Sequence, residues 1–517
     1  MPRLLVVDLG GSSMRAAVVD GDGGNILARA ARSVQHVLDA PPLGRSYDAG
    51  ALWEAACAAV REALLRAGGE PPAAVAATGQ RIGCVALGPG DVPLYVGPNL
   101  DTRGAATGWA VAEAGGEDLY PRTGRSLAML YAPARLVWFR QERPEVFERI
   151  RRVMGLGDWL ALKLCGEAAC EPGTAADLLA LDVREGAYWP ELWSRCGLDP
   201  EWLPPLRRAG EGLGAVTEEA AAVTGIPAGT PVAVTAPDSA AAMLGAGAER
   251  PGTTLVLAGS TMPVLAATER VCEPDGVVWV GPHPAGERGV VESNAGPTGF
   301  GWAWTAERLV GQVSRLEGDA AFAHAERLAA AAAAGASDTL AYGAGASVMN
   351  ATRPATFLAQ TRALFWPTDV LHPEVGAPQV LRAALESVAH SARANAEQVE
   401  ALAGGGDGSG SGDDRGGSGE GAPRLVVAGG MARSRLLLRI LASLTARPVH
   451  TPRVLDATVI GAAACASVAA GLHADLDAAA AALAHVDVAA QPEPELVPVY
   501  AEAHRRWRSL YARIESL

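Results

Sequence analysis

The sequence predicts an α/β protein with two large domains, and three observations support this prediction. The chain has 517 residues, more than a single hydrophobic core usually supports. Strand-like apolar runs and helical patterns occur in both halves of the chain. A strand, a glycine-serine turn and a second strand open the sequence at 4–20, and the same pattern recurs at 253–268. We therefore expect an internal duplication, with one domain over 1–250 and a second over 251–517.

Strands followed by one clear helix are predicted at the start of the chain. The apolar run at 4–10 and the run at 15–20 are joined by a tight turn, and the Asp20–Gly24 cluster reverses the chain again. A helix is expected over 48–67, because apolar residues recur there at every fourth position.

The rest of the first half alternates short strands with helices. A strand is expected at 73–80 and a hairpin at 85–97, since both are apolar runs bounded by glycine or proline. The region 105–225 is expected to be mostly helical with loops. A strand, a turn and a helix of small residues follow at 231–248.

The second half repeats the strand-turn pattern and then departs from it. The segment 381–402 has the pattern of a helix, and 424–444 that of a strand, a Gly-Gly turn and a helix. Between them, 404–423 is rich in glycine, serine and acidic residues. Because it has no large apolar side chain to offset the entropy of ordering, we expect an inert, disordered surface insertion there.

Composition excludes several classes of function. A net charge of −14 does not fit a nucleic-acid-binding surface, which needs clustered Lys and Arg. The first apolar run stops at Asp8, too early for a signal peptide, and the alanine-rich stretch after Leu328 is too short to span a membrane. The seven cysteines are scattered without a CxxC pair. We therefore expect a cytoplasmic protein with reduced cysteines, no membrane contact and no nucleic-acid partner.

The first candidate site follows the opening strand. Asp8 is the last polar residue of that strand, and it precedes Gly10, Gly11, Ser12 and Ser13. Glycine-rich turns let backbone N–H groups approach a phosphate, and a nearby carboxylate is suited to hold Mg²⁺. A plain hairpin turn with a capping aspartate is the alternative.

Two further turns and one acid share these features. Turns also follow apolar strands at Gly259-Ser260-Thr261 and at Gly429-Gly430, the latter expected to open a helix that faces an anion or a base. Asp238 lies between a strand and a segment of small residues. It is either a helix N-cap or a general base that accepts the proton of a substrate hydroxyl.

Paired polar residues suggest a site for a polyhydroxylated ligand. Gln80 and Arg81 follow a strand, and Asp101 and Arg103 follow a hairpin. Such donors and acceptors suit hydroxyl groups, although surface ion pairs are the alternative. The fingerprints of P-loop and dinucleotide-binding proteins are both absent from the first turn.

Taken together, these motifs resemble the FGGY family of carbohydrate kinases, within the actin-like ATPase superfamily. The resemblance covers the whole chain apart from 404–423. The motifs that carry it are DLGGSSMR, TGQRIGCV, LDTRG, APDSAAAMLGAGA, LAGST, VVAGGMARSRLLLRILASLTARPV and DATVIGAAACAS. It implies two actin-like (ribonuclease H-like) domains with an interdomain catalytic cleft.

The resemblance also implies a role for each residue. Asp8 and Asp238 would hold Mg²⁺, with Asp238 as the base. The expected ATP-binding residues are Gly10, Gly11, Ser12, Ser13, Arg15, Gly259, Ser260, Thr261, Gly429, Gly430 and Met431. The expected substrate-binding residues are Gln80, Arg81, Asp101, Arg103 and Asp238.

The implied reaction is ATP-dependent phosphorylation of a small ketose, polyol or related open-chain sugar. Arg81-Ile82-Gly83 replaces the Met-His-Gly of xylulokinases, while PNLDTRG is similar to the autoinducer-2 kinase branch. Gly11 and Met431 stand where the family usually has Thr and Gly. These departures leave open a catalytically weak, nucleotide-binding sugar sensor or regulator. A homodimer is compatible with the sequence.

Overall fold

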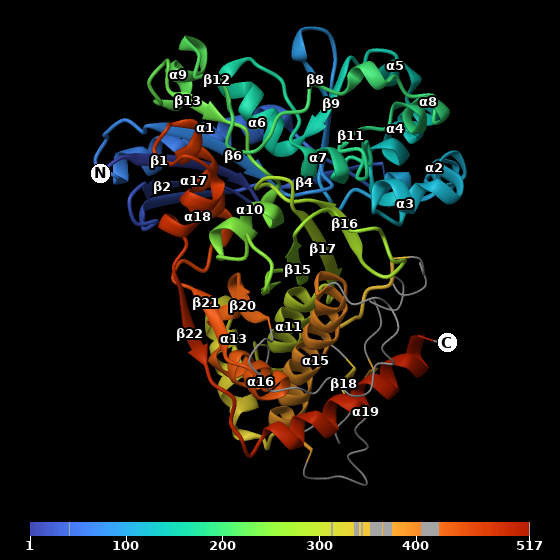
Figure 1. Ribbon diagram of the computed structural model, residues 1–517, viewed down its shortest axis with the longest axis vertical. Helices are drawn as coiled ribbons and strands as arrows, with labels where there is room; N and C mark the ends of the chain where they lie inside the picture. Colours follow the sequence, from blue (N-terminus) through green and yellow to red (C-terminus); the bar gives the residue numbers. More distant parts are fainter. Residues whose placement is uncertain are drawn as a thin grey trace.

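The computed structural model forms two stacked bodies, each built around a β-sheet (Figure 1). It describes residues 1–40, 42–311, 314–335, 341–342, 345–351, 364–365, 375–404 and 423–515. The predicted insertion at 404–423 therefore lies outside the described residues, except for its two end positions. No helix in the described part of the chain is long and apolar enough to cross a membrane.

The upper sheet has six strands in the order β12-β13-β6-β1-β2-β3. These are β1 (Arg3–Leu9), β2 (Ser13–Asp20), β3 (Ile26–Ser33), β6 (Ala74–Gly79), β12 (Gly212–Ala215) and β13 (Pro231–Ala233). Strands β1, β2 and β3 are antiparallel neighbours, whereas β1, β6 and β13 run parallel. The segments that follow β1, β6 and β13 therefore leave the sheet at one edge.

The lower sheet has seven strands in the order β16-β17-β15-β14-β20-β21-β22. These are β14 (Thr253–Leu257), β15 (Pro263–Thr268), β16 (Trp279–Pro282), β17 (Gly289–Asn294), β20 (Arg424–Ala428), β21 (Val449–Pro452) and β22 (Val486–Ala490). Strands β14, β15 and β17 are antiparallel neighbours, and β14, β20 and β21 run parallel. The two sheets thus share a five-strand arrangement, which is what an internal duplication predicts.

Helices cover the sheets as the apolar patterns indicate. Helix α1 (Ala49–Arg66) begins after Asp48, whose side chain accepts a hydrogen bond from the N–H of Ala51 at 2.8 Å. Its apolar face packs in the same core as β1 and β2. The lower core is covered by α11 (Thr298–Ala306), α13 (Gly318–Ala331), α15 (Ala377–Ala403), α16 (Arg435–Thr445) and α19 (Val497–Glu515).

The middle region is helical, as expected, but it also contains short strands. Its helices are α2 (Gly108–Gly115), α3 (Leu119–Thr123), α4 (Ala132–Glu142), α5 (Pro144–Phe147), α6 (Leu156–Cys165), α7 (Pro172–Asp177), α8 (Pro190–Arg195) and α9 (Glu218–Thr224). Strand β9 (Arg152–Gly155) joins β7 (Cys84–Leu87) and β8 (Pro93–Gly97) in a separate sheet. A four-residue strand is too short for a clear periodic signal in the sequence.

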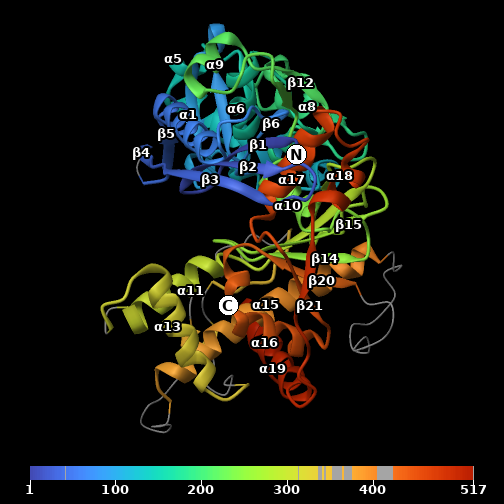
Figure 2. The same cartoon turned by 90° about the vertical axis from the view of Figure 1, so that its left-hand side faces the viewer.

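Two crossing helices lie where the bodies meet (Figure 2). Helix α10 (Asp238–Gly245) follows β13, and α17 (Ala457–Ala469) follows β21. A side chain at Gly245 would collide with Ala457 O, and one at Gly461 with Ala241 O, so glycine is needed for this close approach.

The end of the chain also returns to the upper body. Helix α17 and helix α18 (Leu476–Leu483) pack against Leu4 and Val6 of β1. Figure 1 shows both helices beside β1 and β2. Helices α17 and α18 thus belong to the 251–517 half of the chain but cover the upper sheet. The sequence pattern did not indicate this, because it identifies helices but not the sheet that each one covers.

Candidate active site

Asp8 lies at the carboxyl end of β1, completely buried, and pairs with Arg15 on the neighbouring strand β2. Burial raises the pKa of Asp8 from 3.8 to about 7. The positive charge of Arg15 opposes this rise, whereas the negative charges of Asp456 and Asp238 add to it. The two acids singled out in the sequence, Asp8 and Asp238, are therefore close enough for their charges to interact.

Arg15 connects the two halves of the chain at this point. It also pairs with Asp456, with 3.3 Å between Arg15 Nη1 and Asp456 Oδ2. Asp456 directly precedes α17. Residues 456–467 form one of the motifs that carry the family resemblance, but nothing in the sequence singled out this acid. An acid at the start of a helix was the available signal, but it is equally typical of an ordinary N-cap.

The turn after Asp8 is open to a ligand. The N–H of Gly10 donates to Ser13 O at 2.9 Å and closes the turn. Gly11 and Ser12 are exposed, and there is free space above Gly11. A Cβ at Gly10 would lie 3.1 Å from Arg15 Nη2. Glycine at position 10 thus lets the Arg15 guanidinium lie against the turn.

The two turns of the lower sheet lie side by side, since they follow the paired parallel strands β14 and β20. The N–H of Met431 donates to Ala258 O at 2.9 Å. Gly429 has φ = 91°, and a Cβ there would crowd Ala258 O. Ser260, Thr261 and Gly430 are exposed, so this double turn offers donors and free space to a ligand.

The helix expected directly after Gly429-Gly430 begins later than the sequence suggests. Residues Gly430–Arg433 form a short 3-10 turn, and α16 begins only at Arg435. Ser434 caps α16, with its side chain accepting from Leu437 N. The Gly-Gly pair therefore opens a short 3-10 helix, whereas α16 begins after its own N-cap, Ser434. Met431 packs instead against the edge of the lower core.

Asp238 is the first residue of α10 and is half-buried. Its Oδ1 accepts from the N–H of Ser239 at 2.7 Å, and its backbone oxygen accepts from Thr458 Oγ1 at 3.1 Å. Burial raises the pKa of Asp238, while the charge of Arg81 and the N–H of Ser239 lower it. A carboxylate with a raised pKa suits proton acceptance.

Gln80 holds two loops together. Its Nε2 donates to Gly10 O at 3.3 Å and to Tyr47 Oη at 3.0 Å, and its Oε1 accepts from Asn99 N at 3.0 Å. Because Gln80 is buried and these groups are engaged, its observed contacts fix the first turn against the 98–101 loop.

Asp101 and Arg103 form a buried network behind that loop. Asp101 Oδ2 accepts from Arg103 Nε at 2.6 Å and from Tyr95 Oη, and Oδ1 accepts from the N–H of Arg45 at 3.0 Å. Arg103 also pairs with Asp39. Both carboxylate oxygens of Asp101 are engaged, and both side chains are buried. A direct contact of Asp101 or Arg103 with the substrate stays a prediction.

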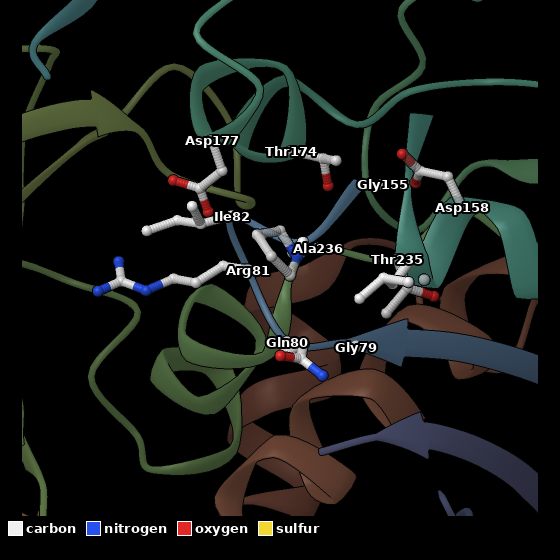
Figure 3. A pocket seen from close by; sticks show the side chains of 14 residues that line it. Gly79, Gln80, Arg81, Ile82, Gly155, Asp158, Thr174, Asp177, Thr235 and Ala236 are labelled. Atoms are coloured by element: carbon white, nitrogen blue, oxygen red, sulfur yellow. The ribbon is translucent and has the colours of Figure 1, made fainter. Parts of the chain in front are cut away.

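A pocket between the two bodies lies next to Asp238. Figure 3 shows a second pocket, which is lined by residues of the upper body alone and shares Arg81, Asp177 and Pro237 with the first. The side chains of Arg81 and Asp177 project to one side of it, and Asp158 lies on the other. The pocket between the bodies is lined by residues of both: Arg81, Arg125, Gly173, Asp177, Pro237, Ser239, Ala240, Leu265, Trp279, Gly281, Pro282, Val290 and Glu292.

The strongest contact across this pocket joins Arg81 and Glu292 of β17 in a two-pronged ion pair. Sequence reasoning predicted Arg81 but missed Glu292, Asp177, Arg125 and Trp279. A glutamate inside the apolar strand GVVESN was a usable signal for Glu292, because buried carboxylates are rare without a partner. No local pattern marks the other three.

The donor set near Asp8 fits a divalent cation. Oδ1 of Asp8 is buried and has no hydrogen-bond partner, and carboxylate oxygens are the ligands that Mg²⁺ prefers. Within the described residues, no group of three or more His, Cys, Asp or Glu side chains could hold a metal on its own. A cation here would therefore need oxygen ligands from water or phosphate as well.

Comparison with known proteins finds two domains of one family in order along this chain. Residues 3–245 match the N-terminal domain, and residues 258–470 the C-terminal domain, of the FGGY family of carbohydrate kinases. The autoinducer-2 kinase of Salmonella typhimurium is 28% identical over 518 residues, covering 98% of this chain and 94% of that protein.

Solved structures share the fold over the whole chain. The xylulose kinase of Rhodospirillum rubrum superposes with a TM-score of 0.81 at 24% identity and 99% coverage of both chains. The gluconate kinase of Lactobacillus acidophilus gives 0.84 at 16% identity, covering 99% of this chain and 98% of that one. With two family domains matched in order, the chain belongs to the FGGY family of carbohydrate kinases, and its class is that of an ATP-dependent sugar kinase.

Proposed function

We propose that this enzyme transfers the γ-phosphoryl group of ATP to a hydroxyl of a small ketose, polyol or related open-chain sugar. The observation that carries the proposal is the convergence of Asp8, Arg15 and Asp238 at the edge where β1 and β13 end. The names of its relatives, autoinducer-2 kinase and xylulose kinase, support acceptors of this kind.

In this proposal, Asp238 accepts the proton of the substrate hydroxyl. General-base assistance of this kind contributes roughly a hundred- to ten-thousandfold to rate. Alignment of the hydroxyl with the phosphoryl group contributes more, up to about 7–11 kcal/mol. Because the transition state is loose, positioning and charge neutralisation outweigh proton removal.

Asp8 and Asp238 would hold Mg²⁺, which neutralises charge on the phosphoryl oxygens when it is bound. Arg15, beside Asp8, adds a positive charge at the same turn. The turns at 10–13 and 259–261 would hold the phosphates, and residues 429–431 the adenosine. Gln80 keeps the first turn in place.

A panel assay tests the proposal. ADP production from Mg-ATP is measured with ketoses, polyols and 4,5-dihydroxy-2,3-pentanedione, with the phosphorylated product identified by mass spectrometry. We expect sugar-dependent ADP production with at least one of these compounds. ATP binding without turnover on any of them would instead favour the sugar-sensing regulator.

A further inference from the structure

The Arg81–Glu292 pair has a consequence for substrate choice. Arg81 follows β6 of the upper body, and Glu292 lies in β17 of the lower body. Their side chains are only 12% and 5% exposed, and both terminal nitrogens of Arg81 contact the carboxylate of Glu292. Arg81, whose charge lowers the pKa of Asp238, therefore already has an anionic partner.

The second arginine of the pocket is also paired. Arg125 Nη2 lies 3.2 Å from Asp177 Oδ1, and both side chains are buried. The ring of Trp279 contacts both arginines, with centroid distances of 5.5 Å to Arg81 and 5.6 Å to Arg125. The two cations and two anions of the lining thus balance one another. Asp238, between the lining residues Pro237 and Ser239, is close enough for its carboxylate to interact with the charges of Arg81 and Asp177.

We propose that Glu292 makes this pocket selective for uncharged polyhydroxy substrates and excludes sugar acids. The proposal rests on the phosphotransfer proposed above and specifies its substrate class. An incoming carboxylate would find no free cation in the lining and would lie near Glu292, Asp177 and Asp238. Like charges brought together in a partly dry site repel one another strongly. Hydroxyl groups can both donate to the carboxylates and accept from the guanidinium groups.

Glu292 acts here by exclusion, a common means of achieving specificity. Exclusion of sugar acids is not a necessary result of this fold, since the gluconate kinase that shares it is named for a sugar acid. Replacing Glu292 by glutamine would keep the shape of the side chain and leave Arg81 free to pair with a substrate carboxylate. The proposal therefore predicts a gain of activity, which damage to the fold would not produce.

The test uses acceptors that differ only at one end of the carbon chain. The full-length protein is assayed with xylitol against xylonate and with glucitol against gluconate, beside the best ketose of the panel. We expect the wild type to favour the neutral member of each active pair by at least about a hundredfold in kcat/KM. In Glu292→Gln we expect kcat/KM for the acid to rise about tenfold or more, with a smaller loss on the neutral compound.

Three variants control the experiment. Glu400→Gln removes a carboxylate that pairs with Arg447 at 3.0 Å, outside the pocket lining, and should leave the preference unchanged. Glu292→Asp keeps the charge and should keep the exclusion. The double variant Arg81→Gln/Glu292→Gln removes the cation together with the anion, and should lose the gain seen in Glu292→Gln. Thermal unfolding shows which variants are folded.

The outcomes separate the two proposals. If the wild type phosphorylates nothing in either series, the proposed phosphotransfer fails. If the wild type is active and uses acids as well as neutral compounds, the exclusion by Glu292 is overturned. A folded Glu292→Gln that gains no activity on acids overturns it too, and if that variant does not fold, the wild-type ratio decides.

Discussion

The turn after β1 and the turn after β14 occupy equivalent places in the two sheets, yet their chemistry differs. Each follows the central strand and leads into an antiparallel neighbour. The N–H of Gly10 donates to Ser13 O, and that of Gly259 to Thr261 O. The strand before the first turn carries the buried Asp8, whereas the second has Leu257 at the corresponding position.

We propose that this difference gives the two turns different roles. Both turns present backbone donors and hydroxyl groups, which suit phosphate binding. The first turn alone adds a buried carboxylate and an arginine, so it is suited to the reacting end of the nucleotide. The second remains without a charged side chain on its strand and is suited to hold phosphates that do not react.

Asp238→Asn has the largest expected effect. It tests whether the catalytic groups lie beside the turn that follows β1. We expect turnover to fall by roughly a hundred- to ten-thousandfold, because the proton acceptor is lost. Binding of an ATP analogue, measured by calorimetry, should stay within a few-fold of the wild type. Near-normal turnover would remove Asp238 from the role of base.

Gly461→Ala tests whether the close contact between α10 and α17 stabilises the fold. These helices follow β13 and β21, which occupy equivalent places in the two sheets. A methyl group there would collide with Ala241 O, so we expect a loss of about 1–3 kcal/mol or more in the free energy of unfolding. Denaturant unfolding measures it. Gly212→Ala is the matched control, since a Cβ at Gly212 meets nothing within 4 Å. Equal stability of the two variants would contradict the packing described here.

Leu257→Asp makes the lower turn resemble the upper one in charge. A carboxylate added beside bound phosphates should raise the KM for ATP about tenfold through like-charge repulsion. Leu257→Asn controls for the loss of the apolar side chain. If the two variants have the same KM, the charge difference between the turns does not matter for ATP.

Asp8→Asn measures what the buried charge costs the fold. Because the pKa of Asp8 is raised from 3.8 to about 7, the wild type should lose stability as pH rises from about 4 through 7. The variant should therefore be more stable than the wild type at pH 8 without metal, by up to about 4 kcal/mol, since each pKa unit corresponds to about 1.4 kcal/mol. That advantage should disappear near pH 4. Thermal unfolding across pH tests this, and a pH-independent difference would argue against a buried charge.

Much of the fold could be predicted because its signals are local. The helix expected over 48–67 is observed at Ala49–Arg66, since its cap and apolar spacing lie within one segment. The pairing of Arg81 with Glu292 could not be predicted, because the two residues are brought together only by the packing of one body on the other. For the same reason, the packing of α17 against the upper sheet could not be predicted from the sequence.

A crystal structure with Mn²⁺ and a non-hydrolysable ATP analogue tests the central claim most directly. We predict that the metal and the terminal phosphate lie between Asp8 and Asp238, with the nucleotide running along 259–261 towards 429–431. A metal and terminal phosphate bound away from both acids would contradict the account.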